Sequence, residues 1–185
     1  MNLWFRLLNM LLRRPWRQSV DPFSTTVVGM RVWPFDLDLN FHVTNGRYLT
    51  MADVGRMDYV LKTGAFRTAL RHKAVPIVGD VWGKFRRELR LFERFEIHTR
   101  MLGWDEKWLF VEHRFMSKGR VVGVVIMRGV FRSGRGPLPP IEIVRDLGVP
   151  EQSPALPEWL QRWSDSCDGL SGHLRGEEGR ALRAA

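Results

Sequence analysis

Apolar and polar residues recur along the chain with two different periods, which divide it into strands and one long helix. Residues 25–33 are rich in β-branched side chains and predict a strand, which Pro34 ends because proline has no amide donor for a sheet ladder. Over residues 46–62 the apolar positions repeat with a helical period, so we expect a helix with Asn45 as its N-cap and Gly64 closing it. A helix of this length spans about 27 Å, enough to cross a small sheet.

Four further strands are predicted after a connecting segment at residues 65–76. Two of the connections between them, at residues 103–107 and 117–120, have the character of hairpin turns. The order of a strand, a long helix and a run of antiparallel strands is typical of an α+β fold with the helix on one sheet face. The four strands are expected at residues 77–89, 95–102, 108–116 and 121–131.

The two ends of the chain differ from this central part in their pattern of apolar, polar and proline residues. Residues 21–135 are expected to form the folded domain. Residues 136–185 form a C-terminal extension in which prolines favour short helices or turns at most, with a mobile polar tail from residue 171. Residues 1–20 predict an amphipathic, basic N-terminal helix.

The N-terminal helix allows two interpretations. It is too short to span a bilayer, and it lacks the layout of a secretory signal. It either packs onto the domain or a partner copy, or anchors the protein peripherally to anionic lipid through residues 1–17. Its apolar face comprises Trp4, Leu7, Leu8, Leu11 and Leu12, and its basic end Arg13, Arg14 and Arg17. In the membrane interpretation, Phe5 enters the headgroup region together with Trp4 and the leucines.

Composition restricts the classes of function. With 185 residues and 44% apolar content, the chain is one domain long and can bury a sizeable core. Its one cysteine, Cys167, excludes an internal disulfide, no zinc-ligand spacing occurs, and we expect no metal and a cytoplasmic protein, at most peripheral at the inner membrane face. The formal charge of +9 suits nucleic acid, anionic lipid or a phosphorylated cofactor, but no nucleic-acid-binding motif accompanies it. We therefore expect no nucleic-acid partner.

The segment at residues 36–49 concentrates the polar chemistry between the first strand and the long helix. A helix start offers unpaired backbone N–H groups, which stabilise oxygen that becomes negative in acyl transfer, and a nearby carboxylate can attack a carbonyl or activate water. Each residue also has a purely structural interpretation: Asp36 and Asp38 order the turn, Asn45 caps the helix, Tyr48 belongs to the core and His42 is a loop histidine. The residues alone leave both interpretations open.

The run D-L-D-L-N-F-H-V-T-N-G-R-Y-L at residues 36–49 resembles the D-x-D-x-x-G-H-V-N-N-x-x-Y signature of the 4-hydroxybenzoyl-CoA thioesterase superfamily. With the later R-R-E-L and L-G-W-D-E-K-W stretches it is similar to the subgroup called thioesterase superfamily member six. The resemblance covers residues 27–132. It implies a hot-dog fold, in which about five antiparallel strands wrap a long central helix, with the N-terminal helix as an addition.

The resemblance also implies an activity and the residues that carry it out. By position, Asp38 matches the aspartate that acts as nucleophile or general base in acyl-CoA hydrolysis, with His42 and Asn45 as further catalytic residues. Two positions depart from the signature, since Phe41 replaces its glycine and Thr44 its first asparagine. The implied supporting or pocket residues are Asp36, Phe41, Thr44, Gly46, Arg47, Tyr48 and Asp53.

The expected substrate is an acyl-CoA or an acyl-carrier-protein thioester, with coenzyme A as part of the substrate and no other cofactor. Relatives are dimers or dimers of dimers with shared active sites, so we expect a homodimer or a dimer of dimers. A weakly active or non-catalytic protein that binds acyl groups or membranes is the alternative. The candidates for binding the coenzyme A phosphates, or for guarding a solvated strand edge, are Lys84, Arg86, Arg87 and Arg90, with Arg94 beyond them.

Overall fold

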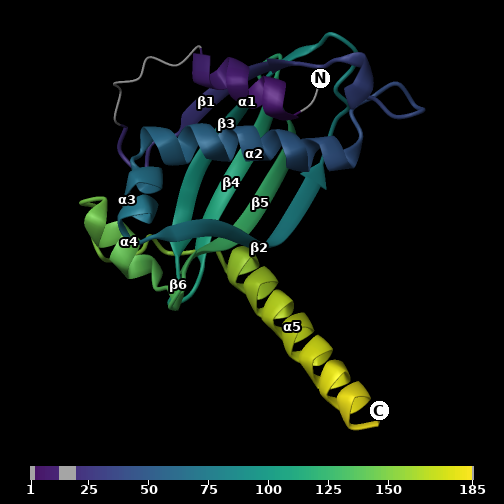
Figure 1. Ribbon diagram of the computed structural model, residues 1–185. Coiled ribbons are helices and arrows are strands. Elements are labelled where there is room, and N and C mark those ends of the chain that lie inside the picture. The colour runs from purple at the N-terminus through teal and green to yellow at the C-terminus, as the bar shows by residue number, and fades with distance from the viewer. Residues whose placement is uncertain (1–2, 13–19, 185) are drawn as a thin grey trace.

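A computed structural model describes residues 3–12 and 20–184 as a curved antiparallel sheet with helices on both of its faces (Figure 1). The sheet has the order β1-β3-β4-β5-β2, and the short β6 pairs with β5. The strands are β1 (Thr26–Arg31), β2 (Ala74–Phe85), β3 (Arg94–Trp104), β4 (Leu109–Ser117), β5 (Arg120–Ser133) and β6 (Gly136–Leu138). The helices are α1 (Leu3–Leu12), the 3-10 turn η1 (Pro34–Asp36), α2 (Asn45–Lys62), α3 (Ala65–Arg71), α4 (Pro140–Asp146) and α5 (Glu158–Ala184).

Helix α2 lies across the inner face of the sheet and forms the main core with it, as predicted (Figure 1). The closest approach is at Gly55, where a Cβ atom would lie 2.7 Å from Thr99 Oγ1 and 2.9 Å from Ile97 Cγ2. Gly64 follows the helix in the left-handed conformation (φ 83°), which confirms its expected role in ending it. Because α2 runs along the whole sheet, its N-terminus is fixed at one end of the molecule.

Several predicted boundaries were wrong at their ends. Thr44, not Asn45, is the N-cap of α2, because Thr44 has the extended conformation (φ −63°, ψ 147°) and Asn45 is already helical. β2 ends at Phe85 rather than at residue 89, since the amides of Arg86 and Arg87 both turn to the carbonyl of Val122. The connecting segment contains α3 and the beginning of β2, and β6 adds a sixth strand to the five expected.

The C-terminal extension was predicted to hold short helices or turns at most. α4 is such a short helix, but the prediction was wrong for α5. α5 is a single helix of 27 residues. Its first half covers the outer face of the sheet through Leu160 and Trp163, which pack on Trp108, Phe110 and Ile126. Its second half, where a mobile tail was expected, continues the same helix away from the sheet (Figure 1). The prolines that suggested breaks all precede it, so nothing in the helix interior lacks an amide donor.

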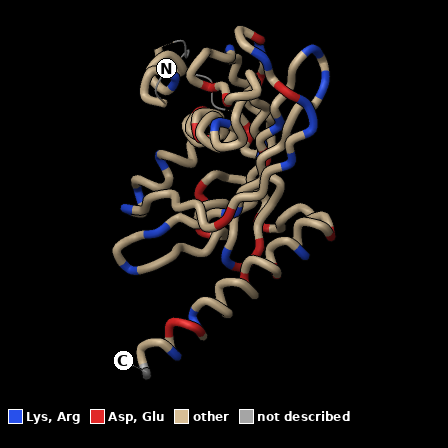
Figure 2. The backbone as a smooth tube through the Cα atoms, turned by 90° about the vertical axis from the view of Figure 1, so that its right-hand side faces the viewer, with Lys and Arg blue, Asp and Glu red and all other residues tan. Residues whose placement is uncertain are grey.

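The N-terminal helix α1 is present and packs beside α2 and the β1 edge, on the same side of the sheet as α2 (Figure 2). Its buried side chains are Arg6 and Met10, while Trp4, Phe5, Leu8 and Leu12 are exposed. The expected apolar face therefore points largely to solvent. The arginines at 13, 14 and 17 lie outside the described residues. Within residues 3–12 and 20–184, no helix is both long and apolar enough to cross a membrane.

Candidate active site

The loop between β1 and α2 is held by a compact set of backbone hydrogen bonds. Leu37 and Val43 form an isolated β-bridge, and the amide of Asp38 donates to the carbonyl of His42 at 2.9 Å. The tip is closed by the amide of Phe41, which donates to the carbonyl of Asp38 at 3.1 Å and has φ 60°. A second bridge joins His42 to Arg90, in the turn after β2. The loop is therefore tied both to itself and to the neighbouring basic segment.

This folding brings three side chains of the site together. His42 Nδ1 lies 3.5 Å from Asp38 Oδ1, and His42 Nε2 lies 4.0 Å from Glu88 Oε2. The side chains of Asp38 and His42 are each 34% exposed, so a ligand can reach both of them. The free rotation of Asp38 is limited because its Oδ1 accepts the amide of Asn40 at 2.8 Å. Asp38 is thus an accessible, oriented carboxylate next to a histidine.

The N-terminus of α2 opens beside this pair. Thr44 makes no side-chain hydrogen bond to the first turn, and the amide of Arg47 donates back to the Thr44 carbonyl at 2.9 Å. Within the described part of the chain, the amides of Asn45 and Gly46 have no acceptor. The space at Gly46 is open, since the nearest atom to a Cβ there would be Thr44 Oγ1 at 4.0 Å. Two backbone donors at the positive end of the helix are therefore available to a negative oxygen.

Asp36 has a structural position and does not join Asp38. It is fully buried, its Oδ2 accepts the amide of Trp33 at 2.9 Å, and its Oδ1 accepts Arg47 Nε at 3.1 Å. Arg6 of α1 completes the ion pair from the other side. Burial lowers the pKa of Arg6, and the charge of Asp36 acts against that shift. Asp36 therefore fastens α1 and the start of α2 to the loop that carries Asp38.

Three other predicted residues lie apart from the pair of Asp38 and His42. Tyr48 is buried in the core between Phe85 and Phe115, and burial, together with Glu93, raises its pKa to about 12. Asp53 points outward from the helix and pairs with Arg56 at 2.9 Å. Phe41 is 78% exposed at the loop tip. Tyr48 is thus part of the core, and the ion-pair partner of Asp53 among the described residues is Arg56.

The basic candidates after β2 are exposed but differ in their partners. Arg90 pairs with Glu88, with Nε 2.8 Å from Oε1. Lys84, Arg86 and Arg87 make no ion pair with any described residue. These three remain the better placed for binding phosphate.

Sequence reasoning missed two residues of the site. Glu88 faces His42 from the turn after β2, and Arg6 reaches Asp36 from α1. The one local signal in the sequence for a role of Glu88 was its position directly after the basic residues Arg86 and Arg87. Nothing in the pattern of α1 indicates that its arginine is buried, because the partner lies 30 positions away along the chain.

Other chemistry finds little support in the described residues. They contain no group of three or more His, Cys, Asp and Glu side chains placed to hold a metal ion. Burial and the neighbouring Asp80 raise the pKa of the Cys167 thiol, which opposes a thiolate nucleophile there.

Comparison with known proteins decides the family. The sequence model of the thioesterase-like superfamily matches residues 32–164. The chain belongs to this superfamily. It is 36% identical to protein THEM6 of Xenopus laevis over 149 residues, which cover 80% of this chain and 71% of that protein. It is 35% identical to protein THEM6 of Danio rerio over 162 residues, covering 86% and 78%.

Solved structures confirm the hot-dog fold that the loop motif implied. A probable thioesterase of Escherichia coli, YbaW, matches with a TM-score of 0.62 and 20% identity, covering 65% of this chain and 94% of that one. The gentisyl-coenzyme A thioesterase BH1999 matches with a TM-score of 0.56 and 21% identity, covering 66% and 98%. The expected class of enzyme, a thioester hydrolase, is confirmed at the level of the superfamily.

Proposed function

We propose that the protein hydrolyses an acyl-CoA to free acid and thiol, with Asp38 as nucleophile or general base. The proposal rests on the accessible Asp38 carboxylate, which lies beside His42 in the loop before α2. The N-cap of this helix, Thr44, makes no side-chain hydrogen bond to the first turn. A carboxylate in this position can attack the thioester carbonyl carbon, or it can remove a proton from the water that attacks it.

The helix start supplies the second requirement of the reaction. When the carbonyl carbon is attacked, its oxygen becomes negative, and the amides of Asn45 and Gly46 are the donors that can bind it. The carbon–sulfur bond then breaks, the thiolate takes up a proton and the acid is released. Over the whole cycle, the hydroxyl of one water is added to the acyl group and its proton to the sulfur.

The carrier of the acyl group is proposed to be coenzyme A, with an acyl-carrier protein as the alternative. Lys84, Arg86 and Arg87 can meet the phosphates at the end of β2. Beneath the C-terminal half of α2 lies a small apolar cavity of about 80 Å³. It is lined by Met101, Val111 and Met127, among others, and this lining suits one end of an acyl chain.

The test is the rate of thiol release from short, medium, long-chain and aromatic acyl-CoAs, for the native protein and for Asp38→Asn. We expect turnover of at least one class of substrate, and a fall in kcat of about 100-fold or more in the variant, because general-base catalysis contributes at least that much. Equal, near-background release by both proteins over the whole panel would rule out the assignment. The rate of hydrolysis of the acyl-carrier-protein thioester of the preferred acyl group, compared with the rate for its acyl-CoA, then identifies the carrier.

A second candidate function is peripheral membrane association, favoured by the exposed face of α1. Trp4 is 73% and Leu12 76% exposed, although both are large apolar side chains. Co-sedimentation with vesicles of anionic lipid tests it, with native protein compared with Trp4→Ser/Leu8→Ser. Binding that the double variant loses would support a membrane contact. No binding by either protein would dismiss it.

We also propose that the protein is a homodimer, joined through the free edge of β2, with a dimer of dimers as the larger alternative. β2 ends the sheet on one side, so its outer backbone groups are unpaired within the described chain. The strand exposes several large apolar side chains, namely Val75, Ile77, Val81, Trp82 and Phe85. A second copy that pairs with this edge would cover them.

A further inference from the structure

Two arginines face each other at the other edge of the sheet. Arg31 ends β1 and Arg94 begins β3, and the two residues are direct partners in the antiparallel register. Side chains of directly opposed residues lie on the same face, and both of these are exposed on the face turned away from α2. Like charges in such a position destabilise the strand pair. The sheet therefore carries an unfavourable pair of like charges where β1 ends and β3 begins.

Other charged side chains of β3 and β4 on the same sheet face are paired. Along β3, His98 lies 2.8 Å from Glu96, and Arg100 lies 2.7 Å from Glu112. Arg114 of β4 shares Glu112, at 2.8 Å. By contrast, Arg31 and Arg94 make no side-chain hydrogen bond or ion pair with any residue of 3–12 and 20–184.

The carboxylate of Glu93, which directly precedes Arg94 in the sequence, is already engaged. Glu93 accepts the hydroxyl of Ser117 at 2.6 Å and the amide of Arg90 at 3.1 Å. It also pairs with Lys118 at 3.5 Å. Burial raises the pKa of Glu93, but these hydrogen bonds outweigh it and the net shift is downward, so the carboxylate stays charged where it is. Glu93 is thus engaged elsewhere, and no side chain of the described residues pairs with Arg31 or Arg94.

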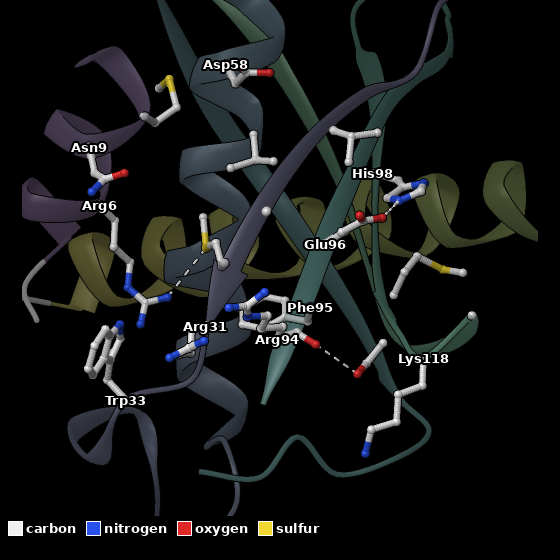
Figure 3. Close-up of a pocket in the computed structure, with 18 of the residues that line it drawn as sticks. Arg6, Asn9, Arg31, Trp33, Asp58, Arg94, Phe95, Glu96, His98 and Lys118 are labelled. Carbon is white, nitrogen blue, oxygen red and sulfur yellow. Dashed lines mark hydrogen bonds and ion pairs between the residues drawn. The ribbon is translucent and has the colours of Figure 1, made fainter. Parts of the chain in front are cut away.

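The pair lines a large groove that runs around the β1 edge, from α1 on one side of the sheet to Glu96 and His98 on the other. The groove has a volume of about 1040 Å³. Figure 3 shows Arg31 and Arg94 next to each other in it, with Trp33 on one side and Lys118 on the other. The ring of Trp33 is held edge-on against Phe92, with 6.1 Å between ring centroids. The groove thus combines two unpaired arginines with an aromatic surface and has room for much more than a phosphate group. Its lining also includes the carboxylates of Glu96 and Asp58, which pair with His98 and Lys62.

We propose that this groove is a binding site for a phosphorylated ligand, whose phosphate group bridges Arg31 and Arg94 and is approached by Lys118. Guanidinium groups bind phosphate through charge-assisted, frequently bidentate hydrogen bonds, which an opposed pair can provide from two strands. The apolar part of the ligand lies toward Trp33. A soluble nucleotide-type phosphate and a phospholipid headgroup share this chemistry. The inference does not depend on the proposed hydrolysis, because binding is measured without turnover.

The test compares the native protein with Arg31→Gln/Arg94→Gln in two arms. The soluble arm titrates adenosine 3′,5′-bisphosphate and inorganic pyrophosphate by calorimetry, and the lipid arm sediments the protein with vesicles that contain phosphatidic acid. The matched control is Arg132→Gln. Arg132 is an exposed arginine near the C-terminal end of β5 and has no ion pair with a described residue. We expect the double variant to lose at least tenfold in affinity in one arm, and the control to change less than twofold.

The thermal stability of a further variant, the single substitution Arg94→Gln, provides a readout that a structural role would not give. If the arginines are held together only for a ligand, Arg94→Gln raises the Tm without ligand at low salt, and added salt reduces the gain because it screens the repulsion. In the binding test, a loss of affinity by the double variant in the soluble arm assigns a soluble phosphorylated ligand. A loss by the double variant in the lipid arm alone assigns a phospholipid headgroup. No binding in either arm, or an equal loss in the double variant and the control, would overturn the proposal.

Discussion

Arg128 is the residue that joins the C-terminal helix to the sheet. Its side chain is fully buried, donates to Asp80 at 2.7 Å and to Asp168 at 2.9 Å, and lies over the ring of Trp108. It also donates to the carbonyl and the hydroxyl of Ser164 on α5. A single buried guanidinium thus satisfies acceptors from a strand and a helix.

We predict that Arg128→Ala lowers the free energy of unfolding by about 3 kcal/mol, because both carboxylates and the Ser164 carbonyl lose their donor. Urea denaturation measures this loss, and limited proteolysis of α5 should become faster. Arg132→Ala is the control and should remain within about 0.5 kcal/mol of the native protein. Equal effects of the two substitutions would contradict the role given to Arg128.

His113 is a buried histidine in the middle of β4 that the proposed reaction does not use. Its Nδ1 lies 2.9 Å from Thr99 Oγ1, and its Nε2 lies 3.5 Å from Met127 Sδ. Burial, with a smaller contribution from the positive charge of Arg56, lowers the pKa of His113 from 6.5 to about 3. The native state therefore keeps the imidazole neutral where the unfolded chain protonates it.

This shift predicts how stability depends on pH. Between about pH 6.5 and 3 the unfolded state binds more protons at this position, so stability falls as the pH falls, by up to about 1.4 kcal/mol per unit. Above pH 6.5 the contribution is constant. Urea denaturation of native protein and His113→Gln at pH 7, 5.5 and 4.5 should show the native advantage shrinking toward acid. Parallel pH profiles would disprove the assignment.

At the scale of elements, the contact between α2 and the sheet depends on the absence of a side chain at Gly55. We predict that Gly55→Ala destabilises the protein by about 1–3 kcal/mol, because the new methyl group would overlap Thr99 and Ile97. This loss includes the opposing effect of helix propensity, which favours alanine over glycine by about 1 kcal/mol. Thermal unfolding measures the effect.

The control for that substitution lies in the second half of α5. A Cβ at Gly172 would meet only the end of Arg175, at 4.0 Å. Gly172→Ala should therefore raise the helical circular-dichroism signal and leave the Tm unchanged or slightly higher. A loss of Tm in Gly172→Ala as large as that in Gly55→Ala would contradict the explanation by the close approach of α2 to the sheet.

The elements also show how far the sequence could predict the structure. The strands and α2 could be found because each repeats apolar residues with its own period, and the glycines at 64 and 119 mark real positive-φ positions. α5 could not, because its glycines and polar residues argue against a helix, and its stability comes from distant partners on the sheet. The same is true of the site: the motif located Asp38 and His42, but Glu88 and Arg6 reach it from other segments.

At the scale of the whole molecule, the proposed dimer places the β2 edge inside an interface. We predict that Val81→Lys, on β2, shifts the mass measured by sedimentation from dimer to monomer, because the buried charge would lack a partner. Val27→Lys is the matched control, since it lies on the opposite edge strand and Val27 is 44% exposed against 42% for Val81. If both variants remain dimeric, or both dissociate, the dimer is not joined through β2.

The central claim is that Asp38 performs thioester hydrolysis at the start of α2, and it is tested most directly by two matched substitutions. Asp38→Asn and Asp146→Asn each remove one partly exposed carboxylate, and the side chain of Asp146 is 32% exposed against 34% for Asp38. Thiol release should fall about 100-fold or more in Asp38→Asn, with the fold and the oligomer unchanged, and stay within about threefold of native in Asp146→Asn. Native-like turnover by Asp38→Asn, or equal losses in both variants, would contradict the claim.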